Sequence, residues 1–483
     1  MAEMDIKYLP EQQAVIEATE PCLKVRAGAG TGKTSTLVGY AKARPSKRML
    51  YLAFNKAIQL EAETKFPKNT TCRTVHSIAY GKVAASRYKH KLAFGTPRAN
   101  EIARTLKTNV VNAFHGINTL NAFLYSADSE IGVSHAFSAD VVPEQHARAI
   151  DCAKAIWKAM RAPEGDVAMV HDGYLKLYHL EGHVPTGFDL IMMDEAQDAN
   201  PVTAAIVDGF SGGKVYVGDQ NQGVYAFRGA QDAMEGLGAP EYPLSTSFRF
   251  GQPVADVANI LLEYAIADDM RLTGAGKGSE VDGRRFSGST ALIARTNGKL
   301  IGYAMDLINE GKSFHVVGGP ESLRLGILMD AYHLYSRDNG NIKTPYIRQF
   351  ESWANLERVA EDIDDPELTW LVGLVKKYGH GIPGVVTDIR NNCLPSSSGA
   401  AEILSTAHKS KGLEFDNVML ADDFKPLSDP EGVDIQEANL LYVAVTRAKR
   451  SLHLNDEVRE FIASPVMNPK AESAKRKTRQ KAA

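Results

Sequence analysis

The sequence lacks the features that mark secreted, membrane and disulfide-stabilised proteins. Its cysteines occur singly, at Cys22, Cys72, Cys152 and Cys393, and this scatter predicts buried, reduced thiols rather than disulfides or a cysteine metal site. No apolar run reaches the roughly 18 residues of a membrane span. The first residues lack the basic, then apolar pattern of a signal peptide. We therefore expect an intracellular, cytoplasmic protein with no membrane partner.

The chain also lacks a strong excess of charge of one sign. Its formal net charge is −3, so a nucleic acid could bind only at a local basic patch. With 483 residues, 44% of them hydrophobic, the chain is long enough for roughly two to four domains and more than one core. These figures describe an ordinary globular protein, so function has to be sought in the motifs.

The stretch Ala27–Thr34 is the strongest motif in the sequence. A strand-like run at 23–26 precedes it, a helix-like run at 35–42 follows it, and this is the context of a phosphate-binding loop. Lys33 would reach the terminal phosphates of a nucleotide and the Thr34 hydroxyl would bind Mg²⁺. The alternative is a glycine-rich surface turn. The loop residues expected at the nucleotide are Ala27, Gly28, Ala29, Gly30, Thr31, Gly32, Lys33 and Thr34.

A second motif is a pair of acids at the end of a buried strand. The apolar run at 187–193 predicts this strand, and Asp194 and Glu195 follow it directly. Downstream of a phosphate loop, Asp194 would hold Mg²⁺ and Glu195 would orient and deprotonate a water molecule. The alternative is an acidic turn.

Polar and aromatic residues follow three further predicted strands. The run at 49–54 ends at Asn55, a short strand precedes 74–77, and the run at 214–219 leads into a loop with Tyr225, Phe227 and Arg228. Aromatic rings beside arginine can stack on bases and contact phosphates, although both rings could equally be core residues.

The order of predicted elements indicates an α/β fold with two parallel sheets, each interrupted by a mainly helical insertion. Helical patterns include 100–114 and 143–160, and His171 with Asp172 is interpreted as a helix start. The last segment gains lysine and arginine, so we expect a disordered tail that binds DNA or a partner protein, or only keeps the chain soluble. The expected divisions are 1–80 with 180–243 for the first domain, 81–179 for its insertion, 244–317 with 400–463 for the second domain, 318–399 for its insertion, and 464–483 for the tail.

Taken together, the motifs resemble those of superfamily 1 helicases of the UvrD/Rep type. The segments 171–177 and 440–449 are most similar to the helicase core of the F-box DNA helicase family. The resemblance implies two RecA-like P-loop NTPase domains, ATP bound between them and single-stranded DNA crossing both. No F-box region precedes the core, so we expect that the adaptor role of that family does not carry over. The insertion at 318–399, only about 80 residues long, is shorter than in larger relatives.

The resemblance also implies roles for individual residues. Gln13 would recognise adenine, Phe248 would stack on it, and Glu414 would support the ribose or the nucleotide. Gln222 would sense the γ-phosphate, and Arg249 and Arg447 would act as arginine fingers. The residues expected to contact DNA are Phe54, Asn55, His76, Tyr225, Phe227, Arg228, Asn297 and His408.

The expected function is that of a monomeric, ATP- and Mg²⁺-dependent DNA helicase or translocase moving 3′ to 5′. Its partners would be single-stranded DNA and junctions with duplex, in repair, recombination or replication, near the nucleoid in a bacterial or phage setting. Two alternatives stay open. One is a translocase that mainly strips recombinase or other protein from single strands, and the other is a non-motor switch that uses ATP to change its affinity for nucleic acid.

Overall fold

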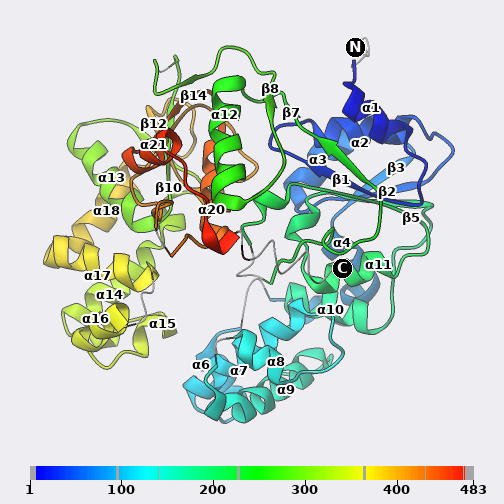
Figure 1. Ribbon diagram of the computed structural model, residues 1–483. Helices are drawn as coiled ribbons and strands as arrows, with labels where there is room; N and C mark the ends of the chain where they lie inside the picture. Colours follow the sequence, from blue (N-terminus) through cyan, green and yellow to red (C-terminus); the bar gives the residue numbers. More distant parts are fainter. Residues whose placement is uncertain are drawn as a thin grey trace. The chain divides into compact units, whose positions relative to one another are not determined.

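The computed structural model describes residues 7–93, 97–139, 141–225, 229–284, 286–362, 366–429, 431–471 and 473. The chain divides into two compact units (Figure 1). The first comprises Met1–Ala27 and Gly32–Leu244, and the second comprises Gly28–Thr31 and Ser245–Ala483. In the described part of the chain, no helix is long and apolar enough to cross a membrane.

The first unit is built on a six-stranded sheet of order β3-β2-β4-β5-β1-β6, in which every neighbouring pair is parallel. Parallel strands need helical crossovers, which cover both faces of such a sheet. The predicted strands at 49–54 and 187–193 are present but shorter. The elements are α1 Pro10–Glu17, β1 Cys22–Ala27, α2 Lys33–Lys42, β2 Met49–Leu52, α3 Lys56–Lys65, β3 Thr70–Arg73, β4 Leu190–Met193, α11 Pro201–Asp208, β5 Gly213–Gly218 and β6 Glu241–Leu244.

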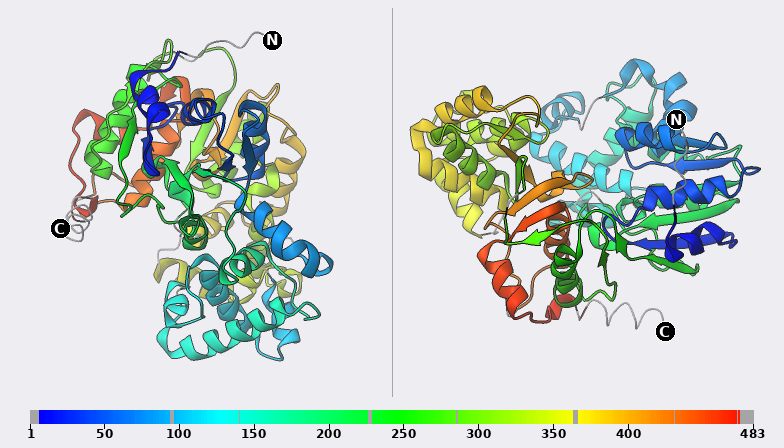
Figure 2. Two further views of the ribbon diagram at one scale, coloured as in Figure 1. Left: turned by 90° about the vertical axis from the view of Figure 1, so that its right-hand side faces the viewer. Right: turned by 90° about the horizontal axis from the view of Figure 1, so that it is seen from above.

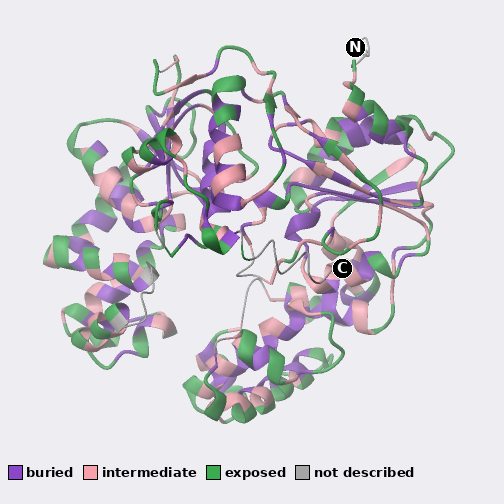
Figure 3. Ribbon diagram, viewed as in Figure 1, coloured by how far each residue is buried: buried purple, intermediate pink, exposed green. Residues whose placement is uncertain are grey.

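Side chains of these strands alternate between two hydrophobic cores. Met49 and Tyr51 belong to the core under α1, α2 and α3, whereas Leu50 and Leu52 belong to the core that includes Val207 of α11. This is the period-2 alternation of a strand that is buried on both faces. Figure 2 shows the helices on the two sides of the sheet, and Figure 3 shows the buried strands. The sheet is therefore packed on both faces, and its strand ends carry the side chains described below.

The helical insertion of the first unit contains a break that the sequence interpretation missed. The single helix expected at 100–114 is wrong, because α6 ends at Thr105 and α7 begins at Val110. Lys107 has a φ of 53°, and the Asn109 side chain accepts a hydrogen bond from the Asn112 N–H at 2.7 Å, which caps α7. Helix α4, Val75–Ala79, precedes the insertion, whose helices are α5 Ala85–Arg87, α6 Ala99–Thr105, α7 Val110–Tyr125, α8 Val133–Ser138, α9 His146–Arg161 and α10 His171–Leu180.

The second unit has its own six-stranded sheet, of order β11-β12-β10-β13-β14-β9, again parallel throughout. A separate short pair joins β7 and β8. The predicted helical insertion is present as α14–α18, which share a core with α13. The elements are β7 Thr246–Ser247, α12 Gln252–Ile260, β8 Thr273–Gly274, β9 Glu280–Val281, β10 Thr290–Ala294, α13 Asn297–Asn309, β11 Phe314–Val316, α14 Leu325–Tyr335, α15 Pro345–Arg348, α16 Trp353–Asp362, α17 Pro366–Tyr378, α18 Ile382–Asn392, β12 Glu402–Thr406, α19 Ala407–Ser410, β13 Phe415–Leu420, α20 Ile435–Val445, β14 Ala448–His453 and α21 Asp456–Ala463.

The C-terminal segment differs from the expected disordered tail where it begins. Asn468 is buried, and its side-chain amide donates to the carbonyls of Ala265 and Val433 at 2.8 and 2.9 Å. Ala471 is buried as well. The start of the tail is therefore held on the second unit by polar contacts that its basic composition did not reveal.

Candidate nucleotide and nucleic-acid site

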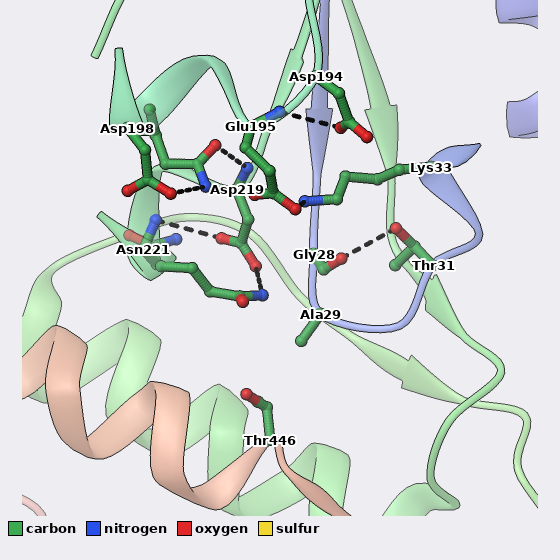
Figure 4. A network of polar contacts seen from close by, with 12 residues as sticks. Gly28, Ala29, Thr31, Lys33, Asp194, Glu195, Asp198, Asp219, Asn221 and Thr446 are labelled. Atoms are coloured by element: carbon green, nitrogen blue, oxygen red, sulfur yellow. Dashed lines mark hydrogen bonds and ion pairs between the residues drawn. The ribbon is translucent and has the colours of Figure 1, made fainter. Parts of the chain in front are cut away.

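The loop between β1 and α2 has the backbone of a phosphate cradle. Gly30 and Gly32 have φ values of 73° and 79°, a left-handed conformation that favours glycine. Gly32 is the N-cap of α2, so the first free N–H groups of that helix follow directly. The Thr31 hydroxyl donates to the Gly28 carbonyl at 2.9 Å and closes the turn (Figure 4).

Lys33, the first residue of α2, forms an ion pair with Glu195. Its Nζ lies 2.8 Å from Glu195 Oε1, and both side chains are at most one-fifth exposed. Figure 4 shows the two side chains pointing toward each other from different elements. Glu195 follows β4 in a left-handed conformation with a φ of 52°, unusual for a residue with a side chain. Such local strain is typical of functional positions that the surrounding structure holds in place.

Asp194 lies at the end of β4 and is nearly fully buried. Its Oδ2 accepts a hydrogen bond from the Tyr51 hydroxyl at 2.5 Å, and its Oδ1 accepts one from the Glu195 N–H at 2.9 Å. Burial, reinforced by the negative charge of Glu195, raises the pKa of Asp194, while Lys33 acts in the opposite direction. Burial works to lower the pKa of Lys33, but the surrounding acids outweigh it and the net shift is upward. The lysine therefore stays charged in this acidic setting.

A second layer of side chains connects Glu195 with Gln222. The side-chain amide of Gln197 donates from Nε2 to Glu195 Oε2 at 2.6 Å. Its Oε1 accepts from the Asp219 backbone N–H at 3.1 Å. Gln222 donates to Asp219 Oδ2 at 2.7 Å. The predicted sensor is thus linked to the predicted base through Gln197 and Asp219. Sequence reasoning missed both, although the position of Asp219 directly after β5 was a usable signal.

The acids around Lys33 fit a nucleotide-bound Mg²⁺. Asp194, Glu195 and Asp219 all act electrostatically on a single lysine, so acids outnumber bases in this cluster. Among the described residues, no group of three or more His, Cys, Asp or Glu side chains could hold a metal ion. Mg²⁺ does not require one, because one or two carboxylates suffice when phosphate oxygens and water complete the coordination. Asp194 and the Thr34 hydroxyl would supply the protein ligands.

The glutamine that faces the phosphate-loop helix is Gln12 rather than Gln13. Gln12 is buried, accepts from the Leu9 N–H at 3.0 Å and donates to Thr36 Oγ1 of α2 at 3.1 Å. Gln13 is exposed and donates to Glu17 one turn further along α1. The rotation of α1 on its axis therefore turns the predicted adenine-reading residue toward solvent, and Gln12 is the better candidate.

A cavity of about 450 Å³ in the first unit joins two groups of predicted functional residues. Phe54, His76 and Tyr225, predicted to contact DNA, line it together with Asp194 and Glu195. The rings of Phe54 and Tyr225 stack with centroids 5.9 Å apart and planes 12° apart. The stacked aromatic pair and the two acids thus line the same cavity.

Residues 9–234 match the family model described as the UvrD/REP helicase N-terminal domain, and residues 403–455 match that of the UvrD-like helicase C-terminal domain. Together the two matches cover more than half of the chain. This chain belongs to the UvrD/Rep helicase family. The two parallel-sheet units are accordingly the RecA-like domains of a UvrD/Rep helicase, as the sequence predicted.

Similar curated proteins agree with this assignment. The chain is 31% identical over 506 positions to F-box DNA helicase 1 of Gallus gallus, covering 95% of this chain and 50% of the relative. It is 31% identical over 512 positions to F-box DNA helicase protein 1 of Schizosaccharomyces pombe, covering 94% and 58%. Identity to the ATP-dependent DNA helicase UvrD2 of Mycobacterium bovis is 23% over 335 positions, covering 55% and 47%. The chain thus spans about half the length of these relatives.

His171 and Asp172, at the start of α10, do more than begin a helix. The helix begins at His171, as predicted, and His171 Nδ1 lies 2.8 Å from the Tyr174 hydroxyl. Asp172 Oδ1 lies 3.2 Å from His76 Nε2, and both side chains line the cavity. Asp172 therefore positions a predicted DNA contact, a role that its place in the sequence did not indicate.

Other predicted DNA contacts occupy helix starts. Asn55 caps α3, where its side chain accepts from the Ile58 N–H at 2.9 Å. Asn297 is the first residue of α13, and its Oδ1 is buried without a hydrogen-bond partner among the described residues. His408 lies in α19. Phe227 and Arg228 lie outside the described residues, so their assignment stays a prediction.

In the second unit, two predicted nucleotide contacts pair with each other. Arg249 Nε lies 2.9 Å from Glu414 Oε2, and its Nη1 donates to the Thr446 carbonyl at 3.0 Å. Arg447 is buried and donates from Nε to the Val443 carbonyl at 2.9 Å. Phe248 is about half exposed. The roles of Arg249, Arg447, Phe248 and Glu414 at a nucleotide stay predictions.

Proposed function

We propose that this chain is an ATP-dependent DNA helicase that translocates 3′ to 5′ along single-stranded DNA. One observation carries the proposal. The cavity of the first unit is lined by the stacked pair Phe54–Tyr225 and by the acids Asp194 and Glu195. A change at the nucleotide therefore has a short route to a surface that can stack on bases, which is the coupling that a DNA motor requires.

The hydrolytic step follows from the contacts of Glu195. The Lys33 ammonium would leave Glu195 Oε1 and bind the terminal phosphates instead. This leaves the carboxylate oxygen available to accept a proton from water. Gln197 holds the other carboxylate oxygen, so the side chain keeps its direction. When bound, Mg²⁺ neutralises charge on the phosphates, and Asp194 and Thr34 would hold it.

Hydrogen bonds from Gln222 through Asp219 and Gln197 give a second way in which the nucleotide could affect the orientation of Glu195. A phosphate that draws the Gln222 amide away from Asp219 would alter the hydrogen bonds that orient Glu195. Gln222 would thus report whether the γ-phosphate is present.

The decisive experiment measures ATP hydrolysis and strand displacement on 3′-tailed, 5′-tailed and blunt duplexes. The proposal expects hydrolysis that single-stranded DNA stimulates, and displacement that a 3′ tail supports. Lys33→Ala serves as the inactive control. Stimulated hydrolysis in Lys33→Ala would overturn the motor assignment, and displacement that requires a 5′ tail would overturn the polarity.

The same assays separate the helicase from the protein-stripping translocase. The similarity of this chain to F-box DNA helicases is the reason for keeping this second candidate. Weak unwinding of naked forks with efficient clearance of recombinase filaments would favour stripping. Release of a streptavidin block from a strand end in only one direction would exclude a non-motor switch.

A further inference from the structure

Tyr51 contacts the predicted Mg²⁺ ligand from a neighbouring strand. In the parallel pairing of β2 with β4, Tyr51 lies opposite Met192, and Asp194 follows two residues later on the same face. The Tyr51 hydroxyl therefore reaches Asp194 Oδ2, at 2.5 Å. Tyr51 is fully buried, and its hydroxyl is a fixed donor to this carboxylate oxygen.

The tyrosine ring is held as firmly as its hydroxyl. It packs against Phe66 with ring centroids 4.6 Å apart and belongs to the core under α1–α3. On the other carboxylate oxygen, Oδ1, the Glu195 N–H donates at 2.9 Å. Both oxygens of Asp194 thus accept one fixed donor each, and the carboxylate cannot rotate without losing a buried hydrogen bond.

We propose that Tyr51 is a positioning residue that makes the site selective for Mg²⁺ over Ca²⁺. Tyr51 takes one lone-pair site of Oδ2 and the Glu195 N–H takes one of Oδ1, so each oxygen of the fixed carboxylate has one site left. This arrangement favours binding of a metal through a single oxygen over chelation through both. Mg²⁺ accepts single-oxygen ligands in strict octahedral geometry, whereas the larger Ca²⁺ takes more ligands and often binds a carboxylate through both oxygens. The inference rests on the proposed function, in which Asp194 binds the nucleotide's metal.

The chain supplies a matched control for testing this role. Tyr216 is also fully buried, lies on β5 of the same sheet, and donates to Asp208 Oδ1 at 2.6 Å. Asp208 is the last residue of α11 and does not line the cavity. Tyr51→Phe and Tyr216→Phe each remove one hydrogen bond from a buried tyrosine to a carboxylate, although Asp208 is exposed and Asp194 is buried. Urea unfolding of both variants measures how much stability each one loses.

The test measures metal affinity instead of turnover. Full-length wild type and both variants, saturated with a non-hydrolysable ATP analogue, are titrated with Mn²⁺ by electron paramagnetic resonance, and Mg²⁺ or Ca²⁺ then competes. We expect Tyr51→Phe to lower the Mg²⁺-to-Ca²⁺ affinity ratio about fivefold to tenfold, the scale of one hydrogen bond. Tyr216→Phe is expected to leave the ratio unchanged.

Each other result has a defined meaning. An unchanged ratio in Tyr51→Phe, or an equal loss in Tyr216→Phe, would overturn the role of Tyr51. A wild type that binds Ca²⁺ as tightly as Mg²⁺ would also overturn it, and this measurement does not depend on whether the variant folds. A wild type that binds no metal with the ATP analogue would instead overturn the proposed nucleotide site.

Discussion

Lys33 and Glu195, which are 162 positions apart in the sequence, pair with Nζ 2.8 Å from Oε1. Their elements meet because β1 and β4 both neighbour β5 in a parallel sheet, so both strands end at the same edge. The pair places the residue expected to bind phosphate beside the residue expected to activate water. We propose that a bound nucleotide would replace this ion pair as the contact of Lys33.

Glu195→Gln is expected to separate nucleotide binding from hydrolysis. The amide keeps an acceptor for Lys33 but cannot take a proton, so ATP hydrolysis should fall about 10²–10⁴-fold while ATP still binds. Glu61→Gln, which changes an exposed pair with Lys65 on α3, is the control and should hydrolyse ATP normally. Steady-state hydrolysis and binding of a fluorescent ATP analogue check both expectations. Hydrolysis within tenfold of wild type would exclude Glu195 as the base.

Phe54→Ala tests the stacked aromatic pair. Phe54 is 45% exposed and stacks on Tyr225, so its removal takes away a surface for bases. Stacking contributes about 1–3 kcal/mol per base, so the Kd for single-stranded DNA should rise roughly tenfold. Phe137→Ala, a change on α8 of the insertion at a residue 75% exposed, should leave the Kd unchanged. Fluorescence anisotropy of labelled oligonucleotides measures the Kd of each variant. Equal Kd values for Phe54→Ala and Phe137→Ala would contradict the stacking role of Phe54.

Gln12→Ala and Gln13→Ala discriminate between two neighbouring glutamines. Gln12 donates to Thr36 of the phosphate-loop helix, whereas Gln13 pairs with Glu17 at the surface. We expect Gln12→Ala to weaken ATP binding by about 1 kcal/mol, roughly fivefold, and to narrow the preference for ATP over GTP. Gln13→Ala should bind both nucleotides like wild type. The reverse result in calorimetric titrations would restore the original assignment of Gln13.

The burial of Lys176 is expected to make the free energy of unfolding depend on pH. Its buried ammonium donates to the carbonyls of Ser126 and Asp128 at 2.7 and 2.6 Å, near the Asp128 carboxylate and His135. Burial lowers the pKa of Lys176 to about 8, from 10.5. Between these values the unfolded state binds more protons, so the free energy of unfolding rises with pH.

The comparison with Lys176→Met isolates this contribution. From pH 8 toward about 10.5, wild type should gain stability relative to the variant, on the order of 1–3 kcal/mol in total. Urea unfolding of both proteins at several pH values measures the difference. A difference that stays constant or changes in the opposite direction would show that burial does not lower the pKa of Lys176.

Much of the fold followed from local patterns. Buried strands near 49–54 and 187–193, and the turn at Ala27–Thr34, depend on residues close in the sequence, so apolar runs and glycine spacing were sufficient. The break between α6 and α7 was missed because apolar periodicity continues across it, while the cap at Asn109 acts at a single residue.

The sequence by itself determined the phosphate loop, the strand-end acids Asp194 and Glu195, and the division into α/β units with helical insertions. Only the tertiary structure decided that Gln12 and not Gln13 faces α2, and that Tyr51 holds Asp194. The physical reason is the distance along the chain between the residues that interact. Backbone conformation and burial are set largely by neighbouring residues, whereas the pairing of side chains depends on strand order and on how each helix is rotated against the sheet.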